Sequence, residues 1–367
     1  MNTRVGHAEV TRGRTRRLGS LAVLCVALAC TSPPASRAGA APAPVAAAPT
    51  ASGPLGGYVP VSDVAGHAKI SLDLCTILDL LERFPVDYSA ITALYREGGQ
   101  SRNADGTPRA LDKFASGARE KEYVLGAYER QLGAGWMDAF VEAALAGTGP
   151  FASEPEPVRR AALRIGLRDQ LPVAWAFHEM DAAVEKLRRG DVALATGAPH
   201  NWDEVWAYYH GERPECTAHI TAEARGRDFG TGSAVNAGIL AAMKRGLAAL
   251  LAGDSTSAAK ARAQVVRQMS IPQLQAVHRS AILLDAALAR GDADQARVAQ
   301  AEGWAHYRVI EPRVSLADSS SARTLRDVFE LRSPPAAGSE AKVARAVAAA
   351  AKGLGIRQSE LGRYLTR

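Results

Sequence analysis

The sequence predicts an all-α fold, a bundle of repeated antiparallel helical hairpins, and three observations support it. Apolar residues recur at helical spacing through most of the chain after residue 58. The β-branched alternation that is typical of strands nowhere extends for long. The phrase E-x-W-A-x-Y occurs twice, at residues 204–209 and 302–307, and an amphipathic stretch ending in Gly-Asp precedes each copy. Because duplicated units bury their apolar faces against one another, this repeat predicts packed hairpins.

Residues 1–57 have the composition of a leader followed by a tether. A basic stretch at 12–17 precedes an apolar run at 18–29 that is too short to span a membrane comfortably, which is typical of a secretion signal. The small residues at 38–40 predict a signal peptide over 1–40, whereas Leu28-Ala29-Cys30 predicts a lipoprotein signal that ends before a lipidated Cys30. Residues 41–57 are rich in Ala and Pro and predict a flexible linker. We therefore expect an exported protein that is periplasmic, secreted or lipid-anchored at the cell envelope.

The segment after the linker predicts four helices. Apolar spacing marks a helix over 70–81, which Phe84-Pro85 ends. Asp87 caps the next helix, which ends at Gly98-Gly99. Helices are then expected over about 119–132 and 136–146, before a break at 147–157.

The second half predicts helices of the same kind. Apolar stripes over 173–187 and 274–288 indicate the helices that lead into the two copies of the phrase. Residues 233–252 form a further predicted helix, whose many alanines favour helix formation. Shorter helices are expected at 322–331 and 340–353. The expected organisation is a helical-repeat domain over 58–335 and a C-terminal helical extension over 336–367.

The charge of the chain gives no support for a nucleic-acid partner. The formal net charge is +6, but residues 1–40 hold six Arg and one acid, Glu9, so 38 basic and 37 acidic residues remain after the leader. A near-neutral remainder lacks the basic footprint of a nucleic-acid-binding protein. No later segment predicts a transmembrane span in the mature chain.

The sequence lacks the motifs of several catalytic chemistries. None of the eight His lies three residues after a Glu, as in di-iron bundles, and there is no His-Glu-x-x-His helix. A phosphate loop, a Gly-x-Ser-x-Gly elbow and a Cys-x-x-Cys pair are also missing. We therefore predict a binding protein rather than an enzyme.

Two cysteines of the mature chain, Cys75 and Cys216, have two interpretations. An oxidising compartment permits a disulfide between them. Two separate buried thiols are the alternative, because the sequence does not show that these residues approach each other.

The repeated phrase supplies the candidate structural anchors and metal ligands. Trp206 and Tyr209 share one helix face, as do Trp304 and Tyr307, which predicts core anchors between hairpins. Each Glu of the phrase lies about 200° round the helix from its Trp. A solvated or capping role for these acids is the simpler interpretation.

The alternative is a metal site between hairpins, with Glu204 and Glu302 directed inward. His306 is one turn from Glu302, and Tyr208 is one turn from Glu204. Carboxylate, imidazole and phenol groups are suitable ligands for iron or another transition metal. His178 and His278 flank the two apolar stripes and are further candidate ligands, with hydrogen-bonded packing histidines as the alternative.

Three stretches of the chain resemble one protein family. The first stretch is Asp87-Tyr88-x-Ala90-x-x-x-Leu94-Tyr95-x-x-Gly98, followed by Arg109-Ala110-Leu111-x-x-Phe114-Ala115. The second is Trp202-Asp203-Glu204-x-Trp206-Ala207-x-Tyr209-x-Gly211-x-x-Pro214-x-Cys216. The third is Arg227-Asp228-Phe229-Gly230-Thr231 with Asn236, and the later Glu302 unit continues it. This pattern is similar to the low-iron-inducible, iron-assimilating periplasmic proteins of green algae and their bacterial relatives, over roughly residues 60–330. The resemblance implies an exported protein of iron or other metal acquisition, and it implies no particular ligand set.

These observations lead to two hypotheses of different classes. The first is an exported protein that holds iron or a similar metal between repeated hairpins, with the metal ion as its partner. The second is a helical scaffold without metal that binds another protein of the cell envelope, because hairpin repeats offer concave surfaces to protein partners.

Overall fold

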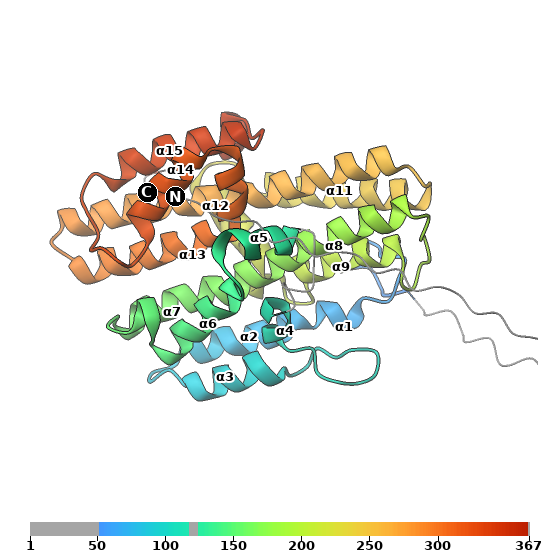
Figure 1. The fold of residues 1–367 in the computed structure, drawn as a ribbon, viewed down its shortest axis with the longest axis horizontal. Helices are drawn as coiled ribbons and strands as arrows, with labels where there is room; N and C mark the ends of the chain where they lie inside the picture. The colour runs from blue at the N-terminus through green and yellow to red at the C-terminus, as the bar shows by residue number, and fades with distance from the viewer. Residues whose placement is uncertain (1–50, 117–123, 366–367) are drawn as a thin grey trace, which may run out of the picture. The chain divides into compact units, whose positions relative to one another are not determined.

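The structure of this chain is a computed structural model that describes residues 51–116 and 124–365. The chain divides into two units, residues 1–47 and 48–367, and the described residues belong to the second. The predicted signal peptide, Cys30 and most of the linker therefore lie outside the described residues. Every helix or strand assigned within the described ranges is a helix, which confirms the all-α prediction (Figure 1).

The helices of the first half are short, and those of the second half include much longer ones. The first group comprises α1 (Ala65–Ala68), α2 (Ile70–Leu81), α3 (Tyr88–Glu97), α4 (Leu111–Ser116), α5 (Val124–Leu132), α6 (Trp136–Ala146), η2 (Gly149–Phe151), α7 (Glu156–Ile165) and η3 (Gly166–Gln170). The second group comprises α8 (Leu171–Arg188), α9 (Ala198–His210), η4 (Pro214–Cys216), α10 (Ala218–Asp228), α11 (Ala234–Leu251), α12 (Ser255–Ala289), α13 (Ala293–Ala317), α14 (Ser319–Phe329), α15 (Ser339–Gly353) and α16 (Gln358–Leu361).

Helices α2 and α3 form for the reasons that the sequence indicates. α2 buries Leu74 and Ile77 completely, as helical spacing requires. The carboxylate of Asp87 accepts the backbone N–H of Ala90 at 2.9 Å and caps α3. α3 ends at Gly98, whose φ of +70° lies in the left-handed region that favours glycine. The chain then enters the loop that leads to α4.

A π-helical turn joins α7 to α8. Helices α7, η3 and α8 follow one another without a gap, and Pro172 is the second residue of α8. The turn buries the carboxylate of Asp169, which accepts the hydroxyl of Thr221 at 2.7 Å and pairs with Arg168 at 2.7 Å. The interior of this bundle therefore contains a buried polar network, formed by Asp169, Thr221 and Arg168, beside its apolar core.

Helix α12 is the central helix of the bundle. It packs against α11, α13 and α15, and also contacts α8 and α10. One large apolar cluster runs through these elements and includes Met243, Leu274, Ile310 and Val347. Burial of this continuous apolar surface is the main stabilising contribution to the fold.

The two copies of the repeated phrase lie on α9 and α13. α8 packs against α9, and α12 packs against α13, with Gly190-Asp191 and Gly291-Asp292 in the respective turns. Trp206, Tyr209, Trp304 and Tyr307 are all buried. The two tyrosine hydroxyl groups are hydrogen-bonded inside the protein. Tyr209 donates to Asn236 Oδ1 at 2.5 Å, and Tyr307 donates to the Ala322 carbonyl at 2.9 Å.

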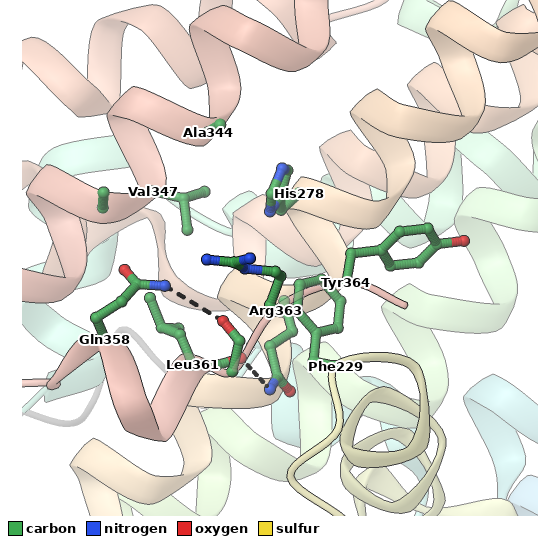
Figure 2. Close-up of a pocket in the computed structure, with 11 residues that line it drawn as sticks. Phe229, His278, Ala344, Val347, Gln358, Leu361, Arg363 and Tyr364 are labelled. Atoms are coloured by element: carbon green, nitrogen blue, oxygen red, sulfur yellow. Dashed lines mark hydrogen bonds between the residues drawn. The ribbon is translucent and has the colours of Figure 1, made fainter. Parts of the chain in front are cut away.

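The chain after α15 returns to the central helix. α16 and the residues that follow it lie over α12, where the Gln275 amide donates to the Leu361 carbonyl at 2.8 Å (Figure 2). α15 itself packs on α12 and α14. The segment predicted as a C-terminal extension is therefore in contact with the core of the bundle.

Helix α11 alone among the described helices is long and apolar enough to cross a membrane. Half of it is buried, and it packs against α9 and α12. Its apolar character is explained by this position in the core, since a helix enclosed by neighbours is apolar on several faces.

The close approach of α11 to α9 generates a packing prediction. A Cβ at Gly246 would lie 2.0 Å from the Trp202 ring, whose indole N–H donates to the Met243 carbonyl at 2.9 Å. We expect Gly246→Ala to lower the free energy of unfolding by about 1–3 kcal/mol, because the buried indole cannot yield without overpacking. Chemical denaturation measures this change.

Gly238→Ala on the same helix is the matched control. Its Cβ would meet only the side-chain amide of Gln268, at 3.1 Å. This amide is the end of a flexible side chain, so the higher helix propensity of Ala should leave the stability unchanged or raised by up to about 1 kcal/mol. Equal losses in the two variants would show that the Trp202 contact does not limit the approach of the helices.

Candidate metal centre

One face of α9 presents three side chains suited to metal binding. His200, Glu204 and Tyr208 follow one another at intervals of four residues, so they lie on the same face over successive turns. The His200 Nε2 atom lies 2.9 Å from Glu204 Oε1. Glu204 is buried, with a side-chain exposure of 9%. The acid of the first copy of the phrase is therefore an interior carboxylate rather than a solvated one.

A second imidazole reaches this carboxylate from α1. His67 Nε2 lies 3.5 Å from Glu204 Oε1, and the His67 and His200 rings meet edge to face with centroids 5.6 Å apart. His67, His200 and Glu204 each offer one ligand atom, and these atoms all lie within 4.8 Å of one another. No other group of three or more His, Cys, Asp or Glu in the described ranges meets this criterion.

The neighbouring acid of α9 places His67. Asp203 is fully buried and accepts the Tyr58 hydroxyl at 2.6 Å, the backbone N–H groups of Val61 and Ser62 at 2.8 and 2.9 Å, and the Ser62 hydroxyl at 2.7 Å. These four bonds fix the chain just before α1 against α9. His67 in α1 thereby comes to lie beside Glu204.

A guanidinium group also reaches the centre. Arg109, in the loop before α4, donates from Nη2 to His67 Nε2 at 2.9 Å and from Nη1 to the Arg102 carbonyl at 3.0 Å. Because a guanidinium only donates, His67 Nε2 is an acceptor and its proton lies on Nδ1. The lone pair that Arg109 engages is the same one that a metal ion would need, so Arg109 and a metal exclude each other at His67.

Burial and charge keep this centre in a metal-binding protonation state. Burial lowers the pKa of His67 to about 4, with the nearby carboxylate of Glu204 opposing the shift. Burial acts to raise the pKa of Glu204, but the His200 hydrogen bond and the electrostatic influence of the surrounding imidazoles and of Arg109 outweigh it, so the pKa lies below its ordinary value. At neutral pH the imidazole of His67 is therefore neutral and the carboxylate is ionised, as metal ligands must be.

Aromatic rings form the inner wall of the centre. The Tyr208 ring contacts His67 edge to face at 5.6 Å and Phe114 of α4 at 5.2 Å, and Phe114 contacts Trp175 of α8 at 4.9 Å. Burial and the charges of Glu204 and Glu179 raise the pKa of Tyr208 well above its ordinary value. The phenol is consequently a neutral neighbour of the three ligand atoms at physiological pH.

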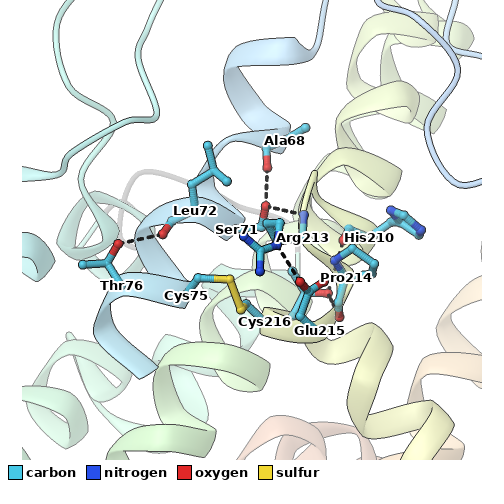
Figure 3. The surroundings of a disulfide bond; sticks show 11 residues. Ala68, Ser71, Leu72, Cys75, Thr76, His210, Arg213, Pro214, Glu215 and Cys216 are labelled. Atoms are coloured by element: carbon cyan, nitrogen blue, oxygen red, sulfur yellow. Dashed lines mark hydrogen bonds and ion pairs between the residues drawn. A yellow bond between two sulfur atoms is a disulfide. The ribbon is translucent and has the colours of Figure 1, made fainter. Parts of the chain in front are cut away.

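A disulfide joins the two elements that follow α1 and α9 in the chain. Cys75 in α2 and Cys216 in η4 are joined, and near them Ser71 accepts the Arg213 N–H at 3.1 Å (Figure 3). α2 directly follows α1, and η4 closely follows α9. The disulfide therefore links the chain just after His67 to the chain just after Glu204. It confirms the disulfide interpretation of Cys75 and Cys216 rather than two separate thiols.

The other sequence-predicted ligands lie in different surroundings. His306 is buried, its Nδ1 lies 2.8 Å from Gln273 Oε1, and burial together with Arg168, Arg225 and Arg279 lowers its pKa well below the ordinary value. Glu302 is half-buried and interacts with the Arg225 charge.

The remaining two histidines have nearby acids. His278 Nε2 lies 3.2 Å from Glu340 on α15, and His178 Nε2 lies 3.9 Å from Glu179. Neither these residues nor Glu302 and His306 belong to a group of three ligand atoms within the described ranges. The structure thus brings Glu204 together with His67 and His200, and it does not bring the other four to that place.

His67 and His200 are absent from the sequence-based ligand set. The interval of four between His200 and Glu204 is a signal that could have found the first of them, since it places both on one helix face. No local signal identifies His67. Its position depends on the Asp203 contacts, which join segments far apart in the sequence.

The donor set fits a first-row transition metal. Two imidazoles and one carboxylate form the set that binds Fe(II) in many non-haem iron proteins, and the same set occurs with Zn²⁺. Because His200 is hydrogen-bonded to Glu204 through Nε2, metal binding there requires its proton on Nδ1. Nδ1 of His67 and Nδ1 of His200 are both buried and accept or donate no bond within the described part of the chain.

The fold and the site define a helical protein with a candidate metal centre, stabilised by a disulfide suited to an oxidising compartment. The chain belongs to the low iron-inducible periplasmic protein family, Fea1, whose model matches residues 35–365. This confirms the resemblance noted from the sequence and the predicted export, since the family is periplasmic. The match also includes α15 and α16. A comparison with curated proteins found no match, and a comparison with solved structures found none.

Arg109 generates a prediction about affinity. We expect Arg109→Met to raise the affinity for a divalent metal by about tenfold, because removal of one charged hydrogen bond frees the His67 lone pair. Competition titration with a chromophoric chelator measures the change. Arg102→Met, in the same loop, is the control, because its side chain bonds only the Gly106 carbonyl at 3.0 Å among the described residues. Weaker binding by Arg109→Met would mean that the guanidinium supports the metal site instead of competing with it.

The disulfide generates a second prediction. Replacing Cys75 and Cys216 together by Ser should lower the free energy of unfolding by about 2–5 kcal/mol, since the bond closes a long loop in the unfolded chain. The same change should weaken metal binding, because α2 and η4, which follow α1 and α9 in the chain, lose their covalent link. Denaturation and metal titration of one preparation measure both effects. An unchanged affinity would show that the Asp203 bonds alone hold His67 in place.

Proposed function

We propose that this periplasmic protein acquires iron by binding a divalent ion, Fe(II) in the first place, at His67, His200 and Glu204. The observation that carries the proposal is the convergence of these three ligand atoms within 4.8 Å in a buried setting. Membership of a low iron-inducible periplasmic family supports iron as the cargo. The ionised carboxylate compensates the charge of the incoming cation, and the two imidazoles supply the nitrogen donors.

The surroundings of the ligands support a cargo that is bound reversibly. Metal-bound histidines usually donate their second N–H group to a carboxylate or carbonyl, and loss of such a partner lowers metal affinity by about 10–100-fold. Neither Nδ1 atom of this centre has a protein partner among the described residues. Arg109 also competes for His67. Both features favour exchange over permanent retention.

The same geometry gives a reason why only one copy of the phrase forms the centre. We propose that α8–α9 and α12–α13 derive from one duplicated hairpin. Position 200 of the first copy then corresponds to Val298 of the second, four residues before Glu302. The second copy lacks an imidazole at that position, and Glu302 faces Arg225 instead. Superposition of the two hairpins on their backbone atoms tests the duplication, and phrases that fail to coincide would reject it.

Metal titration of the purified protein tests the proposed function. We expect one Fe(II) per chain under anaerobic conditions, and at least a tenfold loss of affinity in Glu204→Gln because a charged ligand is removed. Glu302→Gln is the matched control from the second copy, and it also tests the sequence-based prediction that Glu302 is a ligand. Circular dichroism verifies that both variants fold.

Two outcomes would contradict the proposal. Binding that is equal in the native chain and in Glu204→Gln would remove the centre from the function. No stoichiometric binding of Fe(II), Fe(III) or Zn²⁺ by the native chain would favour the alternative function, a helical scaffold that binds an envelope protein.

A further inference from the structure

A cavity lies where the C-terminal residues cover α12. It has a volume of about 170 Å³ and lies between α12, α15 and the segment 358–364 (Figure 2). None of its lining residues belongs to the candidate metal centre. The cavity is therefore a separate feature of the fold.

The backbone of the C-terminal segment is fixed over this cavity. Gly362 adopts a φ of +67°, and the next residues pair with the end of α10, since the Arg363 N–H donates to the Phe229 carbonyl at 3.0 Å and the Leu365 N–H donates to the Asp228 carbonyl at 2.8 Å. A Cβ at Gly362 would lie 2.1 Å from the Phe229 carbonyl oxygen, so glycine is required for this approach. These contacts hold the side chain of Arg363 at the cavity.

The walls of the cavity are apolar and partly aromatic. Val347 and Leu361 line it, and so does Phe229, whose ring contacts Tyr364 at 5.5 Å and His278 at 5.9 Å. Small residues on α15 leave the space open, because Ala344 and Ala348 also line it. An apolar cavity of roughly 150 Å³ holds a benzene ring in a well-studied protein, so this volume suits one six-membered ring.

Two polar groups at the cavity lack partners of their own. The side chain of Arg363 forms no ion pair or hydrogen bond with the described part of the chain, and Figure 2 shows its guanidinium extended toward the space between Val347, Gln358 and His278. Gln275 is 1% exposed and lines the same cavity, and its Oε1 atom has no hydrogen-bond partner among the described residues. Its Nε2 atom donates to Leu361, which fixes Oε1 as the free acceptor.

We propose that this cavity binds a small ring monocarboxylate that carries a hydrogen-bond donor. The carboxylate pairs with Arg363, because a guanidinium matches carboxylate geometry. The ring occupies the apolar space beside Phe229 and Val347. The donor satisfies Gln275 Oε1, which otherwise remains buried and unpaired at a cost in free energy. His278 is already paired with Glu340, so Arg363 is the cation that receives the ligand.

Ligand binding to the full exported chain, with metal removed by chelator, tests this site. The probes are 4-hydroxybenzoate and its neutral isostere 4-hydroxybenzamide, and the para arrangement of the hydroxybenzoate prevents metal chelation. We expect one molecule of 4-hydroxybenzoate per chain by calorimetry, and binding of the amide that is weaker by about tenfold or more. Benzoate should also bind less tightly than 4-hydroxybenzoate, because it leaves Gln275 unpaired.

Variants separate the site from nonspecific binding. Arg363→Met should lose about tenfold in affinity for the acid and nothing for the amide, whereas Arg323→Met removes an exposed charge on α14 and should change neither. Ala344→Leu should abolish binding of both probes by filling the cavity. Ala341→Leu adds the same bulk at an exposed position of α15 and should not. Because no residue of the metal centre is involved, Glu204→Gln should bind the acid as the native chain does.

Three results would overturn the proposal. They are the absence of acid binding at millimolar concentration, equal affinities for the acid and the amide, and unchanged acid binding in Arg363→Met that folds normally by circular dichroism. None of these results bears on iron binding at His67, His200 and Glu204, so the two proposals fail independently.

Discussion

The buried carboxylate of Asp203 joins the start of the described chain to α9, and the candidate metal centre depends on this interaction. A carboxylate without solvent is unfavourable unless hydrogen bonds replace the lost hydration. Asp203 receives four such bonds, all from residues 58–62. Burial still raises its pKa, which shows how strongly the interior opposes the charge. The four bonds hold the segment before α1 against α9, and His67 lies beside Glu204 as a result.

Two acids in the same helix therefore have different tasks. Asp203 and Glu204 are adjacent, so their side chains leave α9 about 100° apart. The first fixes the backbone of a distant segment, and the second remains available to imidazole nitrogens. By contrast, the corresponding position of the second copy, Glu302, lies in a region where Arg168, Arg225 and Arg279 surround His306. The field of these guanidinium groups opposes a second cation, which is why Glu204 is the acid that we assign to metal.

The sequence predicts elements better than it predicts contacts between them. The helical pattern of α2, the Asp87 cap of α3 and the extent of α11 follow from local spacing and capping rules, and the structure shows them at the expected positions. The sequence allows Glu204 to be either a solvated acid or an inward-facing one, because a helical wheel does not show which faces of a helix are covered by neighbouring helices. His67 could not be predicted at all. It reaches the centre through long-range bonds to Asp203, and no pattern within a single segment records such bonds.

The position of Arg109 has a consequence for the metal exchange that we propose. A buried carboxylate that lost its metal would be left with an uncompensated charge, and this penalty would slow departure of the ion. Here a guanidinium on the adjoining loop is within reach of the same imidazole lone pair, so one cation can take over as the other leaves. If the proposed site binds a metal through His67 Nε2, loading requires Arg109 to leave that atom, and the rest of the bundle can keep its packing.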